Sequence, residues 1–181
     1  MAGFMTERLV LRPWTDEDLE ALAAVFSVPE VWRFPLGRGL DRDETRRFLD
    51  RALAAQASGS PFPWAAEERD GGRLIGYVGL AVPAFLPEIM PAVEVGWRLV
   101  PDRWGRGLAT EGGRASLAHG FGVLGLEEIV SIYQPENVAS GQVMARLGMR
   151  VERDTTDPVR GDALRVLRIR RDEWEAAGVR P

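Results

Sequence analysis

The segment EVGWRLVPDRWGRGLATEG, residues 94–112, decides the fold because it joins a strand pattern to a helix pattern through a glycine-rich turn. Its first half alternates apolar and polar side chains, which is typical of a strand. Gly96 stands between Glu94 and Arg98 at the polar positions of that alternation, and a glycine inside a strand often marks a bulge or the close approach of another backbone or ligand. Pro101 then ends the strand. We therefore expect a central strand over 92–101 and, after the turn, a helix to about residue 119.

The turn between these two elements has the composition of an anion-binding loop. Gly105 and Gly107 permit positive φ and carry no Cβ that would block an approaching group. The helix that follows begins with unpaired N–H groups and the positive end of its dipole. Such a loop suits a phosphate or a pyrophosphate, and an ordinary turn is the alternative. The P-loop motif G-x-x-x-x-G-K-S/T is excluded because the chain has no lysine.

On both sides of this segment the chain predicts alternating strands and helices. The Asp70–Gly71 pair favours a hairpin, and helices are expected to begin at Thr15, Asp41 and Asn137, with Gly148 ending the last of them. The other expected strands are 8–14, 61–68, 73–82, 127–133, 149–153 and 163–171. The sequence therefore predicts one α+β domain over 1–181, with a mixed, mainly antiparallel sheet flanked by about four helices.

Composition narrows the classes of function. The net charge of −4 and the pI near 5.2 argue against non-specific nucleic-acid binding and against anionic membranes. The absence of cysteine excludes disulfides, thiolate metal sites and cysteine-linked intermediates. We expect no metal. Because no signal-peptide pattern and no long apolar run occurs, we expect a cytoplasmic protein.

Two motifs carry a resemblance to a known family. The segment 94–112, followed by NVASGQVMARLGM at 137–149, resembles the GNAT superfamily of acetyl-CoA-dependent N-acetyltransferases. The opening TERLVLRPWTDEDLEAL, residues 6–22, is similar to the RimJ/RimL-like branch, which includes ribosomal-protein N-terminal acetyltransferases. The resemblance covers nearly the whole chain in the right order. It implies a GNAT fold, acetyl-CoA as co-substrate and a primary amine as acceptor.

The same resemblance assigns the cofactor residues. The superfamily signature Q/R-x-x-G-x-G/A falls on 104–109, where Trp104 departs from the usual Gln or Arg. It implies that the backbone of 105–110 cradles the pyrophosphate, that the backbone of 97–100 pairs with the pantetheine arm, and that Gly96 helps to splay two parallel strands. The implied cofactor residues are Trp97, Arg98, Leu99, Val100, Trp104, Gly105, Arg106, Gly107, Leu108, Ala109, Thr110, Asn137 and Ser140.

The group that protonates the departing thiolate is left open by the sequence. Many GNAT proteins carry a tyrosine for this step on the helix that begins here at Asn137, but the corresponding residue is Met144, which cannot donate a proton. Ser140 is a candidate by resemblance to the RimJ/RimL-like branch, and Tyr133 is the alternative. Asn137 and Ser140 would also be explained by helix capping alone, which is compatible with a cofactor contact.

The attacking amine must be neutral, which directs attention to acidic residues on the central strand. An α-amine has a pKa of about 7.7–8.0, against about 10.4 for lysine, and so needs only modest help from a base. Glu94 lies on the central strand just before the expected bulge, where it could hold a water; the alternative is an outward-facing or ion-paired carboxylate. Glu111 is more simply a residue that complements the helix dipole, and His119 a surface or core residue.

The acceptor side is the least patterned part of the chain. Trp32 and Phe34 would wall an acceptor pocket or simply pack, and the apolar loop 83–91 would cover the pocket or contact a second subunit in a homodimer. Arginines at 165, 168, 170 and 171 would form the solvated side of an edge strand. We expect an N-acetyltransferase acting on a protein N-terminus or a small-molecule amine, an antibiotic or a polyamine included, in a ternary complex. The alternative is a GNAT-like module that binds an acyl-CoA without turnover.

Overall fold

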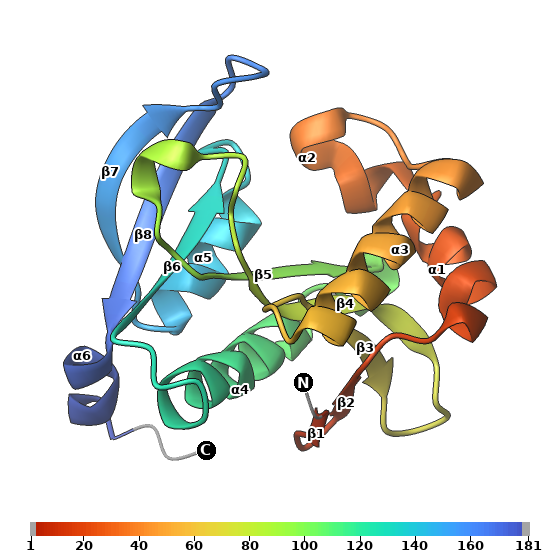
Figure 1. Ribbon diagram of the computed structural model, residues 1–181, viewed down its shortest axis with the longest axis horizontal. Helices are drawn as coiled ribbons and strands as arrows, with labels where there is room; N and C mark the ends of the chain where they lie inside the picture. Colours follow the sequence, from red (N-terminus) through yellow and green to blue (C-terminus); the bar gives the residue numbers. More distant parts are fainter. Residues whose placement is uncertain (1–2, 179–181) are drawn as a thin grey trace.

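The computed structural model describes residues 3–178, which form one eight-stranded sheet with helices around it (Figure 1). Neighbouring strands lie in the order β1-β2-β3-β4-β5-β6-β8-β7, and only β5 and β6 run parallel. This confirms the mixed, mainly antiparallel sheet. The strands are β1 (Phe4–Met5), β2 (Leu9–Arg12), β3 (Trp64–Glu68), β4 (Leu74–Ala81), β5 (Glu94–Leu99), β6 (Glu128–Tyr133), β7 (Arg150–Thr156) and β8 (Ala163–Arg170).

Of the six α-helices in the described residues, four have eight residues or more, in agreement with the expected number. Asp41 begins the longest one as predicted, because its carboxylate accepts the Glu44 N–H at 2.7 Å. The two short helices, α2 and α6, were not predicted. The helices are α1 (Leu19–Phe26), α2 (Arg33–Leu36), α3 (Arg42–Ser58), α4 (Leu108–Gly122), α5 (Val138–Arg146) and α6 (Arg171–Ala176).

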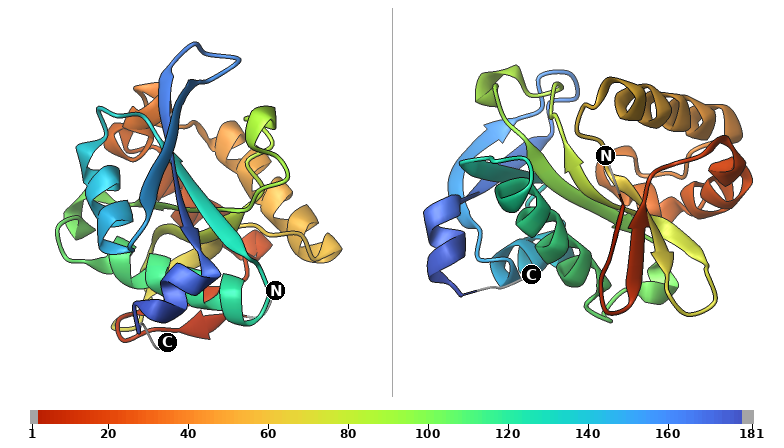
Figure 2. Two further views of the ribbon diagram at one scale, coloured as in Figure 1. Left: turned by 90° about the vertical axis from the view of Figure 1, so that its left-hand side faces the viewer. Right: turned by 60° about the horizontal axis from the view of Figure 1, so that its bottom comes forward.

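The sheet lies between two groups of helices. Consecutive residues of a strand point to opposite faces, and on β4 the ring of Tyr77 stacks on Phe48 of α3 with centroids 5.5 Å apart. Val78, the next residue, lies against Gly112 of α4, where a Cβ would come within 2.9 Å of the valine. Thus α4 covers one face, while α1 and α3 cover the other (Figure 2).

The expectation for the C-terminal arginines was wrong in part. β8 is not an edge strand: it lies between β6 and β7, and β7 forms the edge. Arg165 binds Asp154 on β7 at 2.6 Å, and Arg171 begins α6 instead of ending a strand. By strand alternation Arg165 lies on the same face of β8 as the buried Leu167 and Ile169, whereas Arg168 and Arg170 lie on the same face as the buried Leu164 and Val166. The arginines are partly exposed, but they form neither one solvated side nor an edge strand.

The apolar loop between β4 and β5 packs on the sheet itself. Leu86 is buried in a cluster with Val130 of β6 and Leu164 and Val166 of β8. Phe85 remains 44% exposed on the outer side of this loop. In Figure 1 the loop lies above the left end of β5, and α2 lies above its right half. Within residues 3–178, no helix combines the length and the apolar character that crossing a lipid bilayer requires.

Candidate active site at the divergence of β5 and β6

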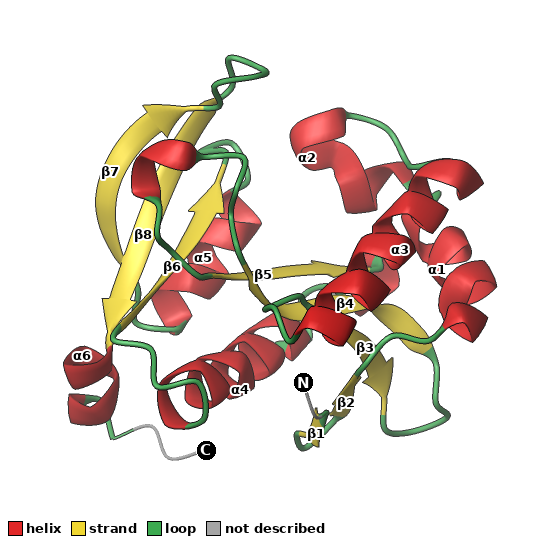
Figure 3. Ribbon diagram, in the orientation of Figure 1, coloured by secondary structure: helices red, strands yellow, loops and turns green. Residues whose placement is uncertain are grey.

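The two parallel strands at the centre of the sheet meet at one point and then separate. Glu94 is paired with Val130, whose N–H donates to the Val93 carbonyl at 3.0 Å. One residue further on, the buried Ser131 hydroxyl donates to the Val95 carbonyl at 2.7 Å. Figure 3 shows the arrows of β5 and β6 pointing apart beyond this place. The β6-facing edge of β5 is therefore open from Gly96 onward.

The backbone groups on that open edge follow from the register with β4. The Val100 N–H donates to the Ile75 carbonyl at 2.9 Å, and the pairing from there to Glu94 contains no bulge. Backbone N–H and C=O groups alternate in direction along a strand, so Val100 faces β4, while Trp97 and Leu99 face the open edge. The Leu99 carbonyl accepts the indole N–H of Trp104 at 2.7 Å. The N–H groups of Trp97 and Leu99 and the Trp97 carbonyl thus point to the open side.

Gly96 leaves room beside Glu94. It pairs with Gly79 across β4 and β5, so neither strand contributes a side chain at this level of the sheet. A Cβ at Gly96 would meet no atom within 4 Å. By strand alternation Gly96 points to the same face as Glu94 and Arg98. The expected bulge at Gly96 was wrong, because β5 pairs regularly with β4 there; the glycine pair instead leaves open space next to the carboxylate.

The glycine-rich loop has the conformation that an anion site requires. Gly105 and Gly107 have φ of 72° and 79°, and a Cβ at Gly105 would meet nothing within 4 Å. Gly107 is the N-cap of α4 and supplies no side chain to satisfy the N–H groups of the first turn. Exposed N–H groups on a positively polarised helix start, with no Cβ in front of them, fit a pyrophosphate.

Ion pairs fix the strand side of this loop to the β3–β4 hairpin. Arg103 binds Glu68 at 2.7 Å, and Arg73 binds Asp102 at 2.7 Å. Asp102 and Arg103 belong to the single helical turn Pro101–Arg103 that leads from β5 into the loop. The loop therefore begins from a fixed position at the end of β5.

Glu94 has the properties of a general base. Burial raises its pKa to about 7, against the opposing effect of the positive Arg98. Its carboxylate makes no hydrogen bond to any residue of the described chain 3–178 and remains partly open to solvent. A carboxylate with this pKa can accept a proton near neutral pH, either directly or through one water.

Arg98 connects this site to the segment that contains α2. Its guanidinium donates to the carbonyls of Val31 and Phe34 at 2.8 and 2.7 Å, and to the Tyr77 hydroxyl at 3.0 Å. It also lies over the Trp32 ring, 4.0 Å from the centroid. The Arg98 side chain therefore fixes the backbone of residues 31–34 next to β5. From the sequence, Arg98 was expected to bind the cofactor through its backbone, and these side-chain contacts were not predicted.

The ring of Tyr133 lies at the first turn of α5, which contains Ser140. Asn137 caps the helix by accepting the Ser140 N–H at 3.3 Å, as predicted. The ring of Tyr133 lies against Gly141, where a Cβ would be 3.1 Å from the phenolic oxygen. Gly141 therefore makes room for the tyrosine beside Ser140. Met144 is 2% exposed and points into the core.

Two aromatic candidates belong to the core. His119 packs between Phe4 and Trp64 with ring centroids 5.5 and 5.1 Å away, and burial lowers its pKa. Trp32 packs edge-on against Phe26, beneath Arg98. Within residues 3–178, no three acidic or histidine side chains come together as a metal site would require. Ser131, Tyr77 and Arg8 were not predicted, because their contacts join residues that are 21 to 98 positions apart in the sequence.

Comparison with known proteins agrees with this geometry. A model of the acetyltransferase (GNAT) domain matches residues 8–150, and the chain belongs to that family. The uncharacterized N-acetyltransferase YoaA of Bacillus subtilis is 31% identical over 148 residues, which cover 81% of this chain and 82% of YoaA.

Solved structures share the fold. An acetyltransferase of the GNAT family from Bacillus anthracis superposes with a TM-score of 0.78 at 23% identity, covering 94% of this chain and 99% of that one. A ribosomal-protein-S5-alanine acetyltransferase from Vibrio fischeri superposes with a TM-score of 0.76 at 18% identity, covering 96% and 99%. The protein is thus an acetyltransferase of the GNAT family, in which acetyl-CoA is the acetyl donor.

Proposed function

We propose that this protein transfers an acetyl group directly from acetyl-CoA to a primary amine, with both substrates bound at once. The observation that supports this most is the place where β5 leaves β6: an open backbone edge, a glycine loop at one end and a carboxylate with a pKa of about 7 at the other. A donor on that edge and an amine at Glu94 would meet without a covalent enzyme intermediate.

In this proposal the backbone holds the cofactor. The N–H groups of 105–110 bind the pyrophosphate, and the edge groups of Trp97 and Leu99 pair with the amides of the pantetheine arm. Arg98 and Val100 complete the stretch, but the Val100 N–H is engaged with β4. Asn137 and Ser140 border the arm from α5. Bound acetyl-CoA supplies an activated thioester carbonyl.

Glu94 makes the amine nucleophilic. With a pKa of about 7 it lies within about one unit of an α-amine at 7.7–8.0, so a proton can pass from amine to carboxylate with little loss of free energy. A lysine side chain, at about 10.4, would be a poorer match. The pKa of Glu94 therefore favours a protein N-terminal α-amine or a weakly basic small-molecule amine as acceptor.

The departing thiolate receives its proton from Tyr133 or Ser140. Both lie at the start of α5, since Gly141 lets the Tyr133 ring rest on the helix. Met144 fills the position where many GNAT proteins have the tyrosine. A phenol is a stronger acid than an alkyl hydroxyl.

Residues 6–22 support assignment to one branch of the GNAT family. Their similarity to the RimJ/RimL-like branch supports a cytoplasmic enzyme that acts on N-terminal amines. The Vibrio fischeri protein is named as a ribosomal-protein-S5-alanine acetyltransferase, but at 18% identity its likeness to this chain concerns the fold. Phe85 and Met90, 44% and 39% exposed on the loop above β5, are the residues through which we propose a homodimer contact.

A module that binds an acyl-CoA without turnover is the second candidate, favoured by Met144. One experiment separates the two: the protein is incubated with acetyl-CoA and a library of amines and N-terminal peptides, and the products are read by mass spectrometry. Acetylation of any acceptor supports the enzyme. Tight CoA binding with neither acetylation nor thioester hydrolysis supports the module.

A melting experiment tests the cofactor assignment on its own. CoA should raise the melting temperature by mass action on the native state, and adenosine should do far less because it lacks the pyrophosphate. Equal shifts from CoA and adenosine, or no shift from CoA, would contradict the phosphate-loop assignment.

A further inference from the structure

The carboxylate of Glu111, in the first turn of α4, is bound by the segment that joins β1 to β2. One oxygen accepts the Thr6 hydroxyl at 2.5 Å and the Arg8 N–H at 2.7 Å, and the other accepts the Arg8 guanidinium at 2.7 and 2.6 Å. Partial burial raises the pKa of Glu111, but these hydrogen bonds outweigh burial and hold the pKa below its usual range. Glu111 is therefore more than a complement to the helix dipole, because it fixes the position of Arg8.

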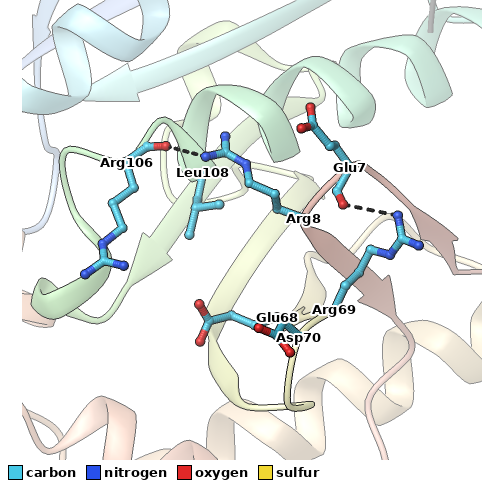
Figure 4. Close-up of a pocket in the computed structure, with 7 residues that line it drawn as sticks. All are labelled: Glu7, Arg8, Glu68, Arg69, Asp70, Arg106 and Leu108. Atoms are coloured by element: carbon cyan, nitrogen blue, oxygen red, sulfur yellow. Dashed lines mark hydrogen bonds between the residues drawn. The ribbon is translucent and has the colours of Figure 1, made fainter.

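Arg8 in turn contacts the glycine loop. Its Nη1 donates to the Arg106 carbonyl at 2.8 Å (Figure 4), and its Nη2 lies 3.5 Å from the place a Cβ would take on Gly107. The guanidinium is thus attached to Glu111 on one side and to the loop backbone on the other. No other side chain of residues 3–178 binds the Arg106 carbonyl.

The contact with the carbonyl determines where an N–H points. The peptide between Arg106 and Gly107 is trans, so its C=O and N–H point in opposite directions. Because the carbonyl faces Arg8, the Gly107 N–H faces away from Arg8. A glycine with φ of 79° tolerates more than one orientation of this peptide at little steric cost. The orientation is therefore set by what the carbonyl binds.

We propose that Arg8 is a positioning residue for the cofactor. Held by Glu111 and Thr6, it orients the Arg106–Gly107 peptide so that the Gly107 N–H is presented to the pyrophosphate, while its own guanidinium stays on the opposite side of the loop. This inference rests on the proposed binding of CoA by residues 105–110. It assigns a function to the contact between the N-terminal hairpin and α4.

Arg12 provides a matched control. It lies on β2 four residues beyond Arg8 and makes a comparable set of charged contacts, to Asp18 at 2.7 Å and Glu67 at 2.9 Å. It has no contact with the glycine loop. Replacing either arginine removes similar ion pairs from the same hairpin, but only Arg8 holds the loop.

The test compares Arg8→Met, Arg8→Lys and Arg12→Met in the full chain. CoA affinity is measured by calorimetry. The acetylation rate is measured as a function of acetyl-CoA concentration, with an acceptor amine identified in the library experiment. We expect Arg8→Met to raise the Kd for CoA and the KM for acetyl-CoA by about tenfold or more, the value of a lost charge-assisted bond, with kcat little changed. For Arg8→Lys, the Kd and the KM should lie between those of the wild type and of Arg8→Met. Arg12→Met should lower the melting temperature but keep the Kd for CoA within about twofold of the wild-type value.

Amide hydrogen exchange of the free proteins gives a readout independent of CoA. Residues 105–108 should exchange faster in Arg8→Met than in the wild type or Arg12→Met. If Arg8→Met does not fold, Thr6→Val, which removes one bond to Glu111, should show the same changes to a smaller degree. Wild-type affinity and exchange in Arg8→Met or, if it does not fold, in Thr6→Val would overturn the role of Arg8 alone. A wild type that does not bind CoA would overturn the proposed function as well.

Discussion

We propose a cofactor side, residues 94–112, and an acceptor side, residues 29–40 and 82–93, and the two differ in structure. Residues 94–112 form a straight strand, a loop held by ion pairs and the start of a helix, and their chemistry resides in backbone N–H and C=O groups. The acceptor side consists of residues 29–40 and 82–93, mostly single helical turns and loops, whose chemistry resides in side chains. Binding of a cofactor by backbone groups needs glycines at fixed positions, and these can be found in the sequence. The side chains that line an acceptor pocket are brought together by long-range packing, which the sequence does not reveal directly.

The largest expected effect lies on the cofactor side, at Gly107. Gly107→Val puts a branched side chain at φ 79° on the Arg8 side of the loop, so the backbone that presents the loop N–H groups must change its conformation. Because several charge-assisted bonds to the pyrophosphate are lost together, the Kd for CoA should rise by about 100-fold or more. Gly59→Val is the control, since Gly59 has φ 72° in open space at the end of α3. Both variants should be folded by circular dichroism, and equal CoA affinity in the two would mean that Gly107 is only a turn residue.

Glu94→Gln tests the proposed general base, which lies where the cofactor side meets the acceptor side. Turnover should fall by about 100-fold, the lower range for general-base catalysis, while CoA affinity stays the same. The wild-type rate should rise with pH through about 7 as Glu94 loses its proton, and the deficit of the variant should shrink as pH approaches the pKa of the amine. A variant with near-normal turnover and an unchanged pH profile would remove Glu94 from the mechanism.

The pH dependence of the melting temperature gives a second test of Glu94→Gln. Because burial raises the pKa of Glu94 from 4.5 to about 7, the folded state binds more protons than the unfolded state in that window, and stability falls as pH rises through it. Gln cannot ionise. Glu94→Gln should therefore melt close to the wild type at pH 4.5 and above it at pH 8. The reverse order at pH 8 would show that the carboxylate is stabilised by a partner.

Arg98→Met should have a smaller effect, confined to the acceptor side. Loss of its bonds to the Val31 and Phe34 carbonyls loosens the wall, so the KM for the amine should rise by about tenfold without a change in CoA affinity. Loss of its positive charge should shift the pH midpoint of the rate upward, since Arg98 lowers the pKa of Glu94. Arg98→Lys keeps the charge and should restore the pH midpoint but not the KM. A parallel loss of CoA affinity would contradict the division into two sides.

The smallest effect is expected from Tyr133→Phe, which keeps the ring on Gly141 and removes the hydroxyl. A thiol has an ordinary pKa of about 8.5, so the departing thiolate needs little help, and turnover should fall by about three- to tenfold. Ser140→Ala made in parallel decides between the two donors. If both single variants and the double variant turn over at the wild-type rate, solvent protonates the thiolate.

Sequence alone was enough for the parts whose physics is local. The Asp41 capping box, the positive-φ glycines of the loop and the Asn137 cap were all predicted because each depends on residues within four positions. Arg8, Arg98 and Ser131 were not, because each acts on a backbone carbonyl from a distant part of the chain. The interior place of β8 was missed for a related reason: strand order is a long-range property.

One titration tests the central claim, that backbone groups of residues 97–110 bind the cofactor. Backbone amide resonances of the protein are followed while CoA is added. We predict the largest shifts at Trp97, Leu99 and residues 105–110, with small changes at 29–40 and 82–93. Shifts confined to those two acceptor segments, or no shifts at CoA concentrations that saturate the melting response, would contradict the account.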